Sequence, residues 1–205
     1  MAYSTPQEEF WAGKFGSDYV SRNNDDSLLA SNTAMFAEIL SYAPGVESVI
    51  EFGANIGLNL RAIRALVPKV QLAAVEVNPS AAAELETLPD IRVHRGSLLD
   101  FDAGETFDLT LSKGVLIHID PARIAAAYET LYRHSHKYIC VAEYYSPSPV
   151  AIPYRGHANR LFKRDFAGEM LAKYPDLQIA KYGFVYRKDP VYPQDDITWF
   201  LLERR

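Results

Sequence analysis

The stretch Val49-Ile50-Glu51-Phe52-Gly53-Ala54-Asn55-Ile56-Gly57-Leu58-Asn59-Leu60 decides the fold of this chain. An apolar strand leads into a glycine-containing turn and then into a helix, which is how an α/β protein builds a nucleotide-binding edge. Gly53 and Gly57 carry no Cβ, so the backbone can turn sharply and the helix start can approach strand and ligand closely. Because the spacing does not match G-x-G-x-x-G, the turn is expected to pass beneath an adenosine without phosphates.

A carboxylate follows where this architecture needs one. Glu76 ends the apolar run 72–75, about 20 residues beyond the turn, where it is expected to bind ribose hydroxyls. The motif Glu51-x-Gly53 with Gly57, followed by Glu76, resembles the class I S-adenosylmethionine-dependent methyltransferases. Over residues 46–205, further stretches fit that family in order: 93–98, 107–119, 138–143 and a closing pair of strands near the C-terminus.

This resemblance implies an α/β fold: a Rossmann-like, mostly parallel seven-stranded sheet with an antiparallel C-terminal strand, helices on both faces and an N-terminal helical lid. It also implies S-adenosylmethionine as cofactor, with Glu51 near its methionine end and Ser97 and Leu98 beside its adenine. Asn55 has a plainer interpretation as a helix cap, and Ser97 as a surface-turn serine. The expected cofactor contacts are Trp11, Tyr19, Glu51, Gly53, Asn55, Gly57, Glu76, Ser97, Leu98 and Ser112.

Within the family, the stretches 143–145, 152–157 and 160–166 look like the methylases found with pseudaminic acid biosynthesis. We therefore expect a small polar acceptor, anionic in character, such as a sugar or nucleotide-sugar intermediate.

Composition limits the remaining function classes. With 205 residues the chain fits one domain, and 48% apolar residues are enough for a core. A net charge of −5 argues against nucleic acid and anionic lipid as partners of the whole surface. The N-terminus lacks a signal-peptide pattern and no apolar run reaches about 18 residues, so a cytoplasmic location without membrane contact is expected. Cys140 is alone in an apolar run, so burial is expected.

The domain is expected to have three parts. Residues 1–45 form the helical lid, with a capping box at Thr5-Pro6-Gln7-Glu8 and a second helix at 27–42. Residues 46–145 form the cofactor-binding core, with strands at 46–52, 71–77, 91–95, 107–112 and 137–145 and helices at 57–66, 79–87 and 121–134. Residues 146–205 supply an irregular substrate loop at 146–158, a helix at 159–173 and two antiparallel closing strands, 177–186 and 197–203.

Aromatic residues of the lid are candidates to surround a sulfonium cation, because ring faces attract cations. Trp11, Phe15 and Tyr19 fit this role, and equally fit packing of the helix onto the domain. Arg22 is a candidate partner for the cofactor carboxylate, against solvated surface as the alternative.

The expected catalytic residues are His118, Tyr144 and His157. His118 follows the fourth strand, where the acceptor meets the methyl group, and imidazole titrates near neutral pH. Its alternative role is to order the loop before Pro121. His134 and His136 lack a third ligand, so no metal site is expected.

The expected substrate-binding residues are Tyr145, Tyr154, Arg155, Arg160 and Lys163. Their basic members lie in a segment without carboxylates, which suggests an anion site; a solvated helix face is the alternative. On the expected helix, Arg160 and Arg164 share one face.

Two other functions stay open on the sequence alone. One is a reaction in which S-adenosylmethionine cyclises or donates its aminopropyl group, releasing methylthioadenosine. The other is a protein that binds the cofactor without turnover. A homodimer is also compatible with the sequence.

Overall fold

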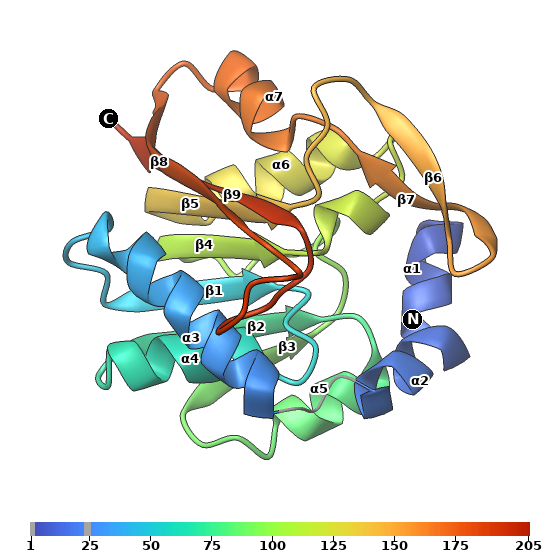
Figure 1. The fold of residues 1–205 in the computed structure, drawn as a ribbon, viewed down its shortest axis with the longest axis horizontal. Helices are drawn as coiled ribbons and strands as arrows, with labels where there is room; N and C mark the ends of the chain where they lie inside the picture. Colours follow the sequence, from blue (N-terminus) through green and yellow to red (C-terminus); the bar gives the residue numbers. More distant parts are fainter. Residues whose placement is uncertain (1–2, 23–25) are drawn as a thin grey trace.

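A computed structural model describes residues 3–22 and 26–205, with only the backbone described at 21, 22 and 26. Its centre is a seven-stranded sheet (Figure 1). In spatial order the strands are β3 (Ile91–Arg95), β2 (Gln71–Glu76), β1 (Ser48–Phe52), β4 (Phe107–Lys113), β5 (Ser135–Glu143), β9 (Ile197–Arg204) and β8 (Leu177–Val185).

The sheet has the expected mixed character. The five strands β1 to β5 are parallel, whereas β9 pairs antiparallel with both β5 and β8. The segment 186–196 between β8 and β9 holds no helix, and a short connection without a crossover requires antiparallel strands. The strand order reverses between β1 and β4, which is where open α/β sheets bind ligands.

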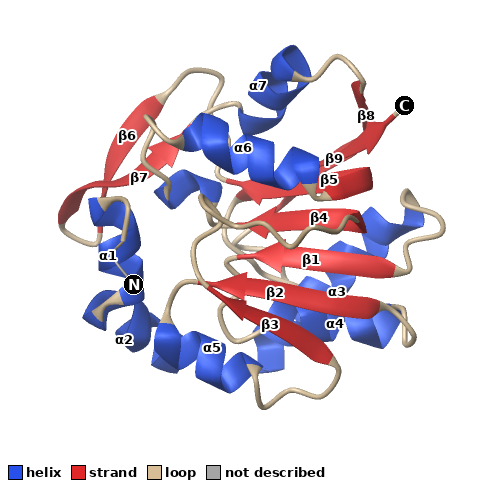
Figure 2. Ribbon diagram, turned by 180° about the vertical axis from the view of Figure 1, so that it is seen from behind, coloured by secondary structure: helices blue, strands red, loops and turns tan. Residues whose placement is uncertain are grey.

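Helices cover both faces of the sheet (Figure 2). On one face, α3 (Asp26–Ser41), α4 (Leu58–Leu66) and Leu85 of α5 (Pro79–Leu85) share a core with Val49. On the other, α6 (Ile124–Arg133) and α7 (Phe166–Lys173) share a core with Ile50 and Phe52. Successive β1 side chains thus enter opposite cores, as the two-residue period of a strand requires. None of the described helices is long and apolar enough to cross a membrane.

The N-terminal helices lie beside a separate two-stranded hairpin at the carboxyl edge of the sheet (Figures 1 and 2). These elements are α1 (Pro6–Ala12), α2 (Lys14–Arg22), β6 (Val150–Tyr154) and β7 (His157–Lys163). The predicted capping box of α1 is confirmed, because Thr5 and Glu8 cap each other reciprocally. Gln7 donates a hydrogen bond to the carbonyl of Asn159 on β7 over 3.3 Å, so helix and hairpin contact each other.

The hairpin corrects two predictions. The expected loop at 146–158 and the first part of the expected helix at 159–173 form β6 and β7, and the helix begins only at Phe166, capped by Asp165. Arg155 and Gly156 both have positive φ, 47° and 85°, as a tight two-residue hairpin turn requires. Pro153 is tolerated because each strand of an isolated pair has one side without hydrogen bonds.

Of two predicted helix starts, the structure confirms one and contradicts the other. The predicted start at Pro79 is confirmed, with the Asn78 side chain accepting from the N–H groups of Ser80 and Ala81. The predicted start at Pro121 is wrong, because α6 begins at Ile124 and Asp120 caps only a preceding turn. Burial of Cys140 is confirmed, and burial raises the pKa of its thiol to about 12.

Candidate functional site

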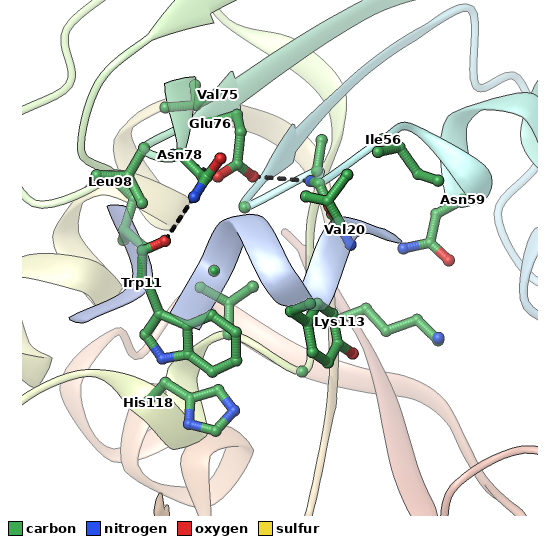
Figure 3. Close-up of a pocket in the computed structure, with 18 of the residues that line it drawn as sticks. Trp11, Val20, Ile56, Asn59, Val75, Glu76, Asn78, Leu98, Lys113 and His118 are labelled. Carbon is green, nitrogen blue, oxygen red and sulfur yellow. Dashed lines mark hydrogen bonds between the residues drawn. The ribbon is translucent and has the colours of Figure 1, made fainter. Parts of the chain in front are cut away.

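A cavity of about 410 Å³ opens where the carboxyl ends of β1, β2 and β4 meet. The turns after these strands form its floor, and α1, α2, the hairpin turn and residues 194–197 enclose it. Figure 3 shows Asn78 and Leu98 at one end, Asn59 and Lys113 at the other, and Trp11 and His118 along one side. This position is the topological switch point of the sheet, so the fold alone marks the cavity as a ligand site.

Glu76 is the best-defined polar group of the cavity. One carboxylate oxygen accepts from the backbone N–H of Asn55 and the other from that of Asn78, each over 2.7 Å. Burial raises the pKa of Glu76, while these backbone donors oppose the rise. Each oxygen keeps a lone pair, so the carboxylate can still accept from a diol in the cavity. The alternative of Asn55 as a helix cap is wrong: α4 begins at Leu58, and its N-cap is Gly57, without a side-chain cap.

Gly53 and Gly57 have different structural roles. Gly53 has φ of 74° and lines the cavity; a Cβ there would lie 2.5 Å from a methyl carbon of Val115. Gly57 has φ of 80°, and a Cβ there would lie 2.7 Å from Leu85. The second glycine therefore lets α4 pack against its neighbour and is not among the cavity-lining residues.

Three polar side chains, Glu51, Asn59 and Lys113, form what we call the polar corner; Asn59 and Lys113 line the cavity, and Glu51 does not. Glu51 is fully buried and accepts from the Asn59 side chain over 2.5 Å. The other Glu51 oxygen and Oδ1 of Asn59 are buried without a hydrogen-bond partner among the described residues, and so is Nε2 of Gln194, which also lines the cavity. Burial raises the pKa of Glu51 to about 8. Unpaired buried polar atoms are costly, so the corner is suited to a polar ligand group.

Aromatic rings line part of the cavity. Trp11 lies with its ring centroid 5.4 Å from that of Tyr19 and 4.5 Å from that of His118. Trp11 and Tyr19 both line the cavity, as does Leu98. Ser97 also lines it, and its hydroxyl hydrogen-bonds Glu8 of α1, which holds the lid on the floor of the cavity.

His118 is held in one tautomer. Its Nδ1 lies 2.5 Å from the carbonyl oxygen of Arg160; because a carbonyl only accepts, Nδ1 carries the proton and Nε2 is free of one. Burial lowers the pKa of His118 to about 4, so the ring is neutral at physiological pH. The turn that carries it is fixed by Glu143, whose carboxylate accepts from the backbone N–H groups of Val115, Leu116 and Ile117.

The acceptor side of the cavity brings together only part of the predicted set. Tyr154 and Arg155 line it from the hairpin turn. Tyr144 does not, but its hydroxyl donates over 2.9 Å to Asp195, which does.

Other predicted site residues lie outside the cavity. Ser112 is buried and donates to Glu143. The ring of His157 packs against Phe10 with 5.0 Å between centroids, and Tyr145 packs near Phe200. The side chain of Arg22 falls outside the described residues.

The expected cluster of basic residues on one helix face is wrong, because the segment is a strand. The Arg160 guanidinium lies over the ring of Phe10 at 5.0 Å, and the Lys163 ammonium lies over that of Tyr144 at 5.1 Å. Arg164 pairs with Glu169 over 2.7 Å. Arg155 is the member of this segment that reaches the cavity.

Sequence reasoning missed several cavity residues. Asn78 had a detectable signal, since it lies two residues after the end of β2, and Asn59 lies in the first turn of the helix that follows the glycine turn. Lys113 is the last residue of β4, and the sequence pattern pointed to Ser112 and His118 instead. Gln194 and Asp195 come from the connection between β8 and β9, and no local pattern places that connection over the cavity.

Known proteins resemble this chain in structure more than in sequence. No protein-family model matches it, and no curated protein matches it. CalS10, an amino pentose methyltransferase from Micromonospora echinaspora solved with S-adenosylmethionine bound, has a TM-score of 0.65 and 15% identity, covering 93% of this chain and 96% of its own. KedS8, a sugar N-methyltransferase from a Streptoalloteichus species, has a TM-score of 0.63 and 18% identity, covering 100% and 96%. DesVI from Streptomyces venezuelae has a TM-score of 0.64 and 14% identity, covering 99% and 100%. The chain therefore has the class I S-adenosylmethionine-dependent methyltransferase fold.

Proposed function

We propose that this protein transfers a methyl group from S-adenosylmethionine to a small polar acceptor. The observation that carries the proposal is the chemistry along the cavity: a carboxylate suited to a diol at one end, Lys113 and the unpaired oxygen of Asn59 at the other, and aromatic rings along its side. A nucleoside joined to an amino acid through a sulfonium has these groups in this order. The residues present therefore fit the cofactor.

Particular residues would hold each part of the cofactor. Glu76 would accept from the ribose hydroxyls, and Leu98 and Ser97 would contact the adenine. The faces of Trp11 and Tyr19 would stabilise the positive sulfur, at about 0.5 to 2 kcal/mol for each ring. When bound, the cofactor supplies an electrophilic methyl group.

His118 would act on the acceptor. Its unprotonated Nε2 belongs to a ring that lines the cavity, so it can accept a hydrogen bond from an acceptor N–H or O–H and orient the nucleophile. Because methyl transfer is an in-line displacement, alignment at about 3 to 3.5 Å is a large part of catalysis. A weakly basic imidazole suits an amine acceptor, which needs only to reach the reaction deprotonated.

The acceptor is proposed to be an amine-bearing sugar with an anionic group, such as a nucleotide sugar. Arg155 at the hairpin turn is placed to pair with the anion. The amine is supported by the names of CalS10 and KedS8, which are an amino pentose and a sugar N-methyltransferase. The narrower likeness to methylases found with pseudaminic acid biosynthesis favours an acidic sugar, and both acceptors belong in the same assay.

Product analysis tests the proposal. The protein is incubated with S-adenosylmethionine and a panel of amino and acidic sugar nucleotides, and products are identified by mass. S-adenosylhomocysteine together with an acceptor heavier by one methylene supports methyl transfer. Methylthioadenosine identifies the aminopropyl or cyclisation reaction instead, and tight binding without turnover across the panel identifies a sensor.

A further inference from the structure

The Glu143 carboxylate, at the end of β5, binds one short segment of the chain. Glu143 is 2% exposed. Its Oε1 accepts from the hydroxyl of Ser112 over 2.9 Å and from the backbone N–H groups of Val115 and Leu116 over 3.0 Å each. Its Oε2 accepts from the N–H of Ile117 over 3.4 Å. None of the ion pairs found among the described residues includes Glu143, so these hydrogen bonds are the main use of its buried charge.

The segment that donates to Glu143 is a single turn of 3₁₀ helix, η1 (Leu116–His118). The backbone N–H of His118 closes the turn by donating to the carbonyl of Val115 over 2.9 Å. A turn of this length leaves the N–H groups at its start without acceptors inside the turn. Leu116 and Ile117 are buried, so these groups need an acceptor from another element, and Glu143 provides it.

This turn supplies side chains to two walls of the cavity. Val115 lines the cavity beside the glycine turn, and a Cβ added to Gly53 would lie 2.5 Å from a methyl carbon of Val115. His118 also lines it, with its ring centroid 4.5 Å from that of Trp11, and Figure 3 shows the two rings next to each other. Glu143 therefore holds the backbone that carries both walls.

We propose that Glu143 is a positioning residue, which holds η1 so that the Val115 side chain and the His118 imidazole face the cavity. Glu143 is not among the cavity-lining residues, so it acts on the reaction only through this turn. In its catalytic consequence the inference rests on the proposed function, and it deepens that function by naming the residue that keeps the imidazole in place. The state of the imidazole can also be measured without turnover.

Three variants and one matched control test the proposal. Glu143→Ala removes all the acceptor atoms, Glu143→Asp draws the carboxylate back by one methylene, and Glu143→Gln keeps an oxygen that can occupy the place of Oε1. The control is Asp108→Ala, at the amino end of β4 and so at the sheet edge opposite the cavity. Asp108 is 8% exposed and accepts from the backbone N–H groups of Glu47 and Ser48 over 2.9 Å each, so the control loses contacts of the same kind.

Nuclear magnetic resonance of ¹⁵N-labelled histidine reports the tautomer and the pKa of His118 without any substrate. The signal that is missing in His118→Ala belongs to His118. In the wild type it should show a proton on Nδ1 and a pKa near 4. In Glu143→Ala the released turn should admit water, so the pKa should rise toward the value of about 6.5 for a solvated imidazole and the single tautomer should be lost. Glu143→Gln and Asp108→Ala should keep both properties.

Kinetics with the acceptor that the product analysis identifies supply the second measurement. Glu143→Ala should lower kcat by about 10- to 100-fold, because a small displacement of a group that orients the nucleophile has an effect of this order. Glu143→Gln should stay within about threefold of wild type, and Asp108→Ala should retain its kcat. Urea unfolding measures the stability lost by each variant, so that an effect on kcat can be compared with an equal loss of stability in the control.

Two results would overturn the inference. One is an unchanged tautomer and pKa of His118 in folded Glu143→Ala. The other is an equal loss of kcat in Glu143→Ala and Asp108→Ala, because the loss would then follow stability alone. If Glu143→Ala does not fold, Glu143→Asp is judged by the same two measurements. If His118 changes as expected but the wild type transfers no methyl group, the positioning role stands and the proposed function fails.

Discussion

Glu51→Gln should make the protein without cofactor more stable and yet weaken cofactor binding. Glu51 is fully buried, and its carboxylate accepts one hydrogen bond, from Asn59, while its second oxygen has no partner among the described residues. Burial raises the pKa of this carboxyl from 4.5 to about 8, although Lys113 opposes the rise. The substitution keeps the shape of the side chain and removes the ionisation.

The sign and size of the effect follow from that pKa. The folded protein holds the Glu51 proton more tightly than the unfolded chain, so the carboxyl's ionisation costs no stability below about pH 4.5, costs more as the pH rises, and costs a constant amount above pH 8. The full difference corresponds to about 5 kcal/mol. Water that enters on ionisation lessens it, so Glu51→Gln should gain on the order of 2 to 5 kcal/mol at pH 8.5 and less than about 1 kcal/mol at pH 5.

Urea unfolding of both proteins at pH 5 and pH 8.5, followed by circular dichroism, measures this difference. Comparing the variant with wild type at each pH cancels other titrating groups, including Glu143, whose pKa burial raises to about 7. Calorimetry with S-adenosylhomocysteine supplies the second measurement, in which the variant should bind more weakly. A variant that is no more stable than wild type at pH 8.5, or that gains equally at both pH values, would refute the reasoning.

Three further outcomes are expected at the cavity. His118→Ala should lower kcat by about 10²- to 10⁴-fold with cofactor affinity intact. In the pH–rate profile of the wild type, the fall in rate that His118 causes should lie near pH 4. A fall in rate near neutral pH that is also present in the variant therefore belongs to the acceptor amine. Glu76→Ala should weaken S-adenosylhomocysteine by about 10-fold or more in calorimetry, since it removes the ribose contact, and equal affinity would remove Glu76 from the site. Arg155→Ala should raise the acceptor KM by about 10- to 100-fold at unchanged cofactor affinity, whereas Arg164→Ala, which breaks a pair with Glu169, is the basic-residue control that should leave that KM in place.

The predictable part of the fold has local causes. Alternating apolar strands and helices at 46–145 require a parallel sheet, and Asn78-Pro79 and Thr5-Pro6 mark helix starts through capping that depends on neighbours in sequence. The hairpin was missed because prolines at 147, 149 and 153 argue against strands in a sheet centre, whereas an isolated pair tolerates them. Because residues 157–163 form a strand, the expected helix face with Arg160 and Arg164 does not form.

The site, like the fold, could be predicted only where residues close in sequence or at strand ends determine it. The cavity is lined by Glu76 and Gly53 at strand ends and by Trp11 in the lid, as the sequence predicts. The rule that parallel strands end at one edge of the sheet is enough to predict that the strand-end residues lie together. His118 was identified by position, but its neutral state was not, because burial and the Arg160 carbonyl set it. Both come from contacts between residues distant in sequence.

By itself, then, the sequence determined the α/β architecture and one wall of the cavity, since spacing, glycine and capping act over a few residues. Only the tertiary structure decided which side chains share the cavity with that wall. Gln194 and Asp195 enter it from a connection near the C-terminus, and Lys113 faces Glu51 through strand register. Burial and pairing are properties of the packed chain, so pKa shifts and unpaired atoms have no counterpart in the linear order of residues.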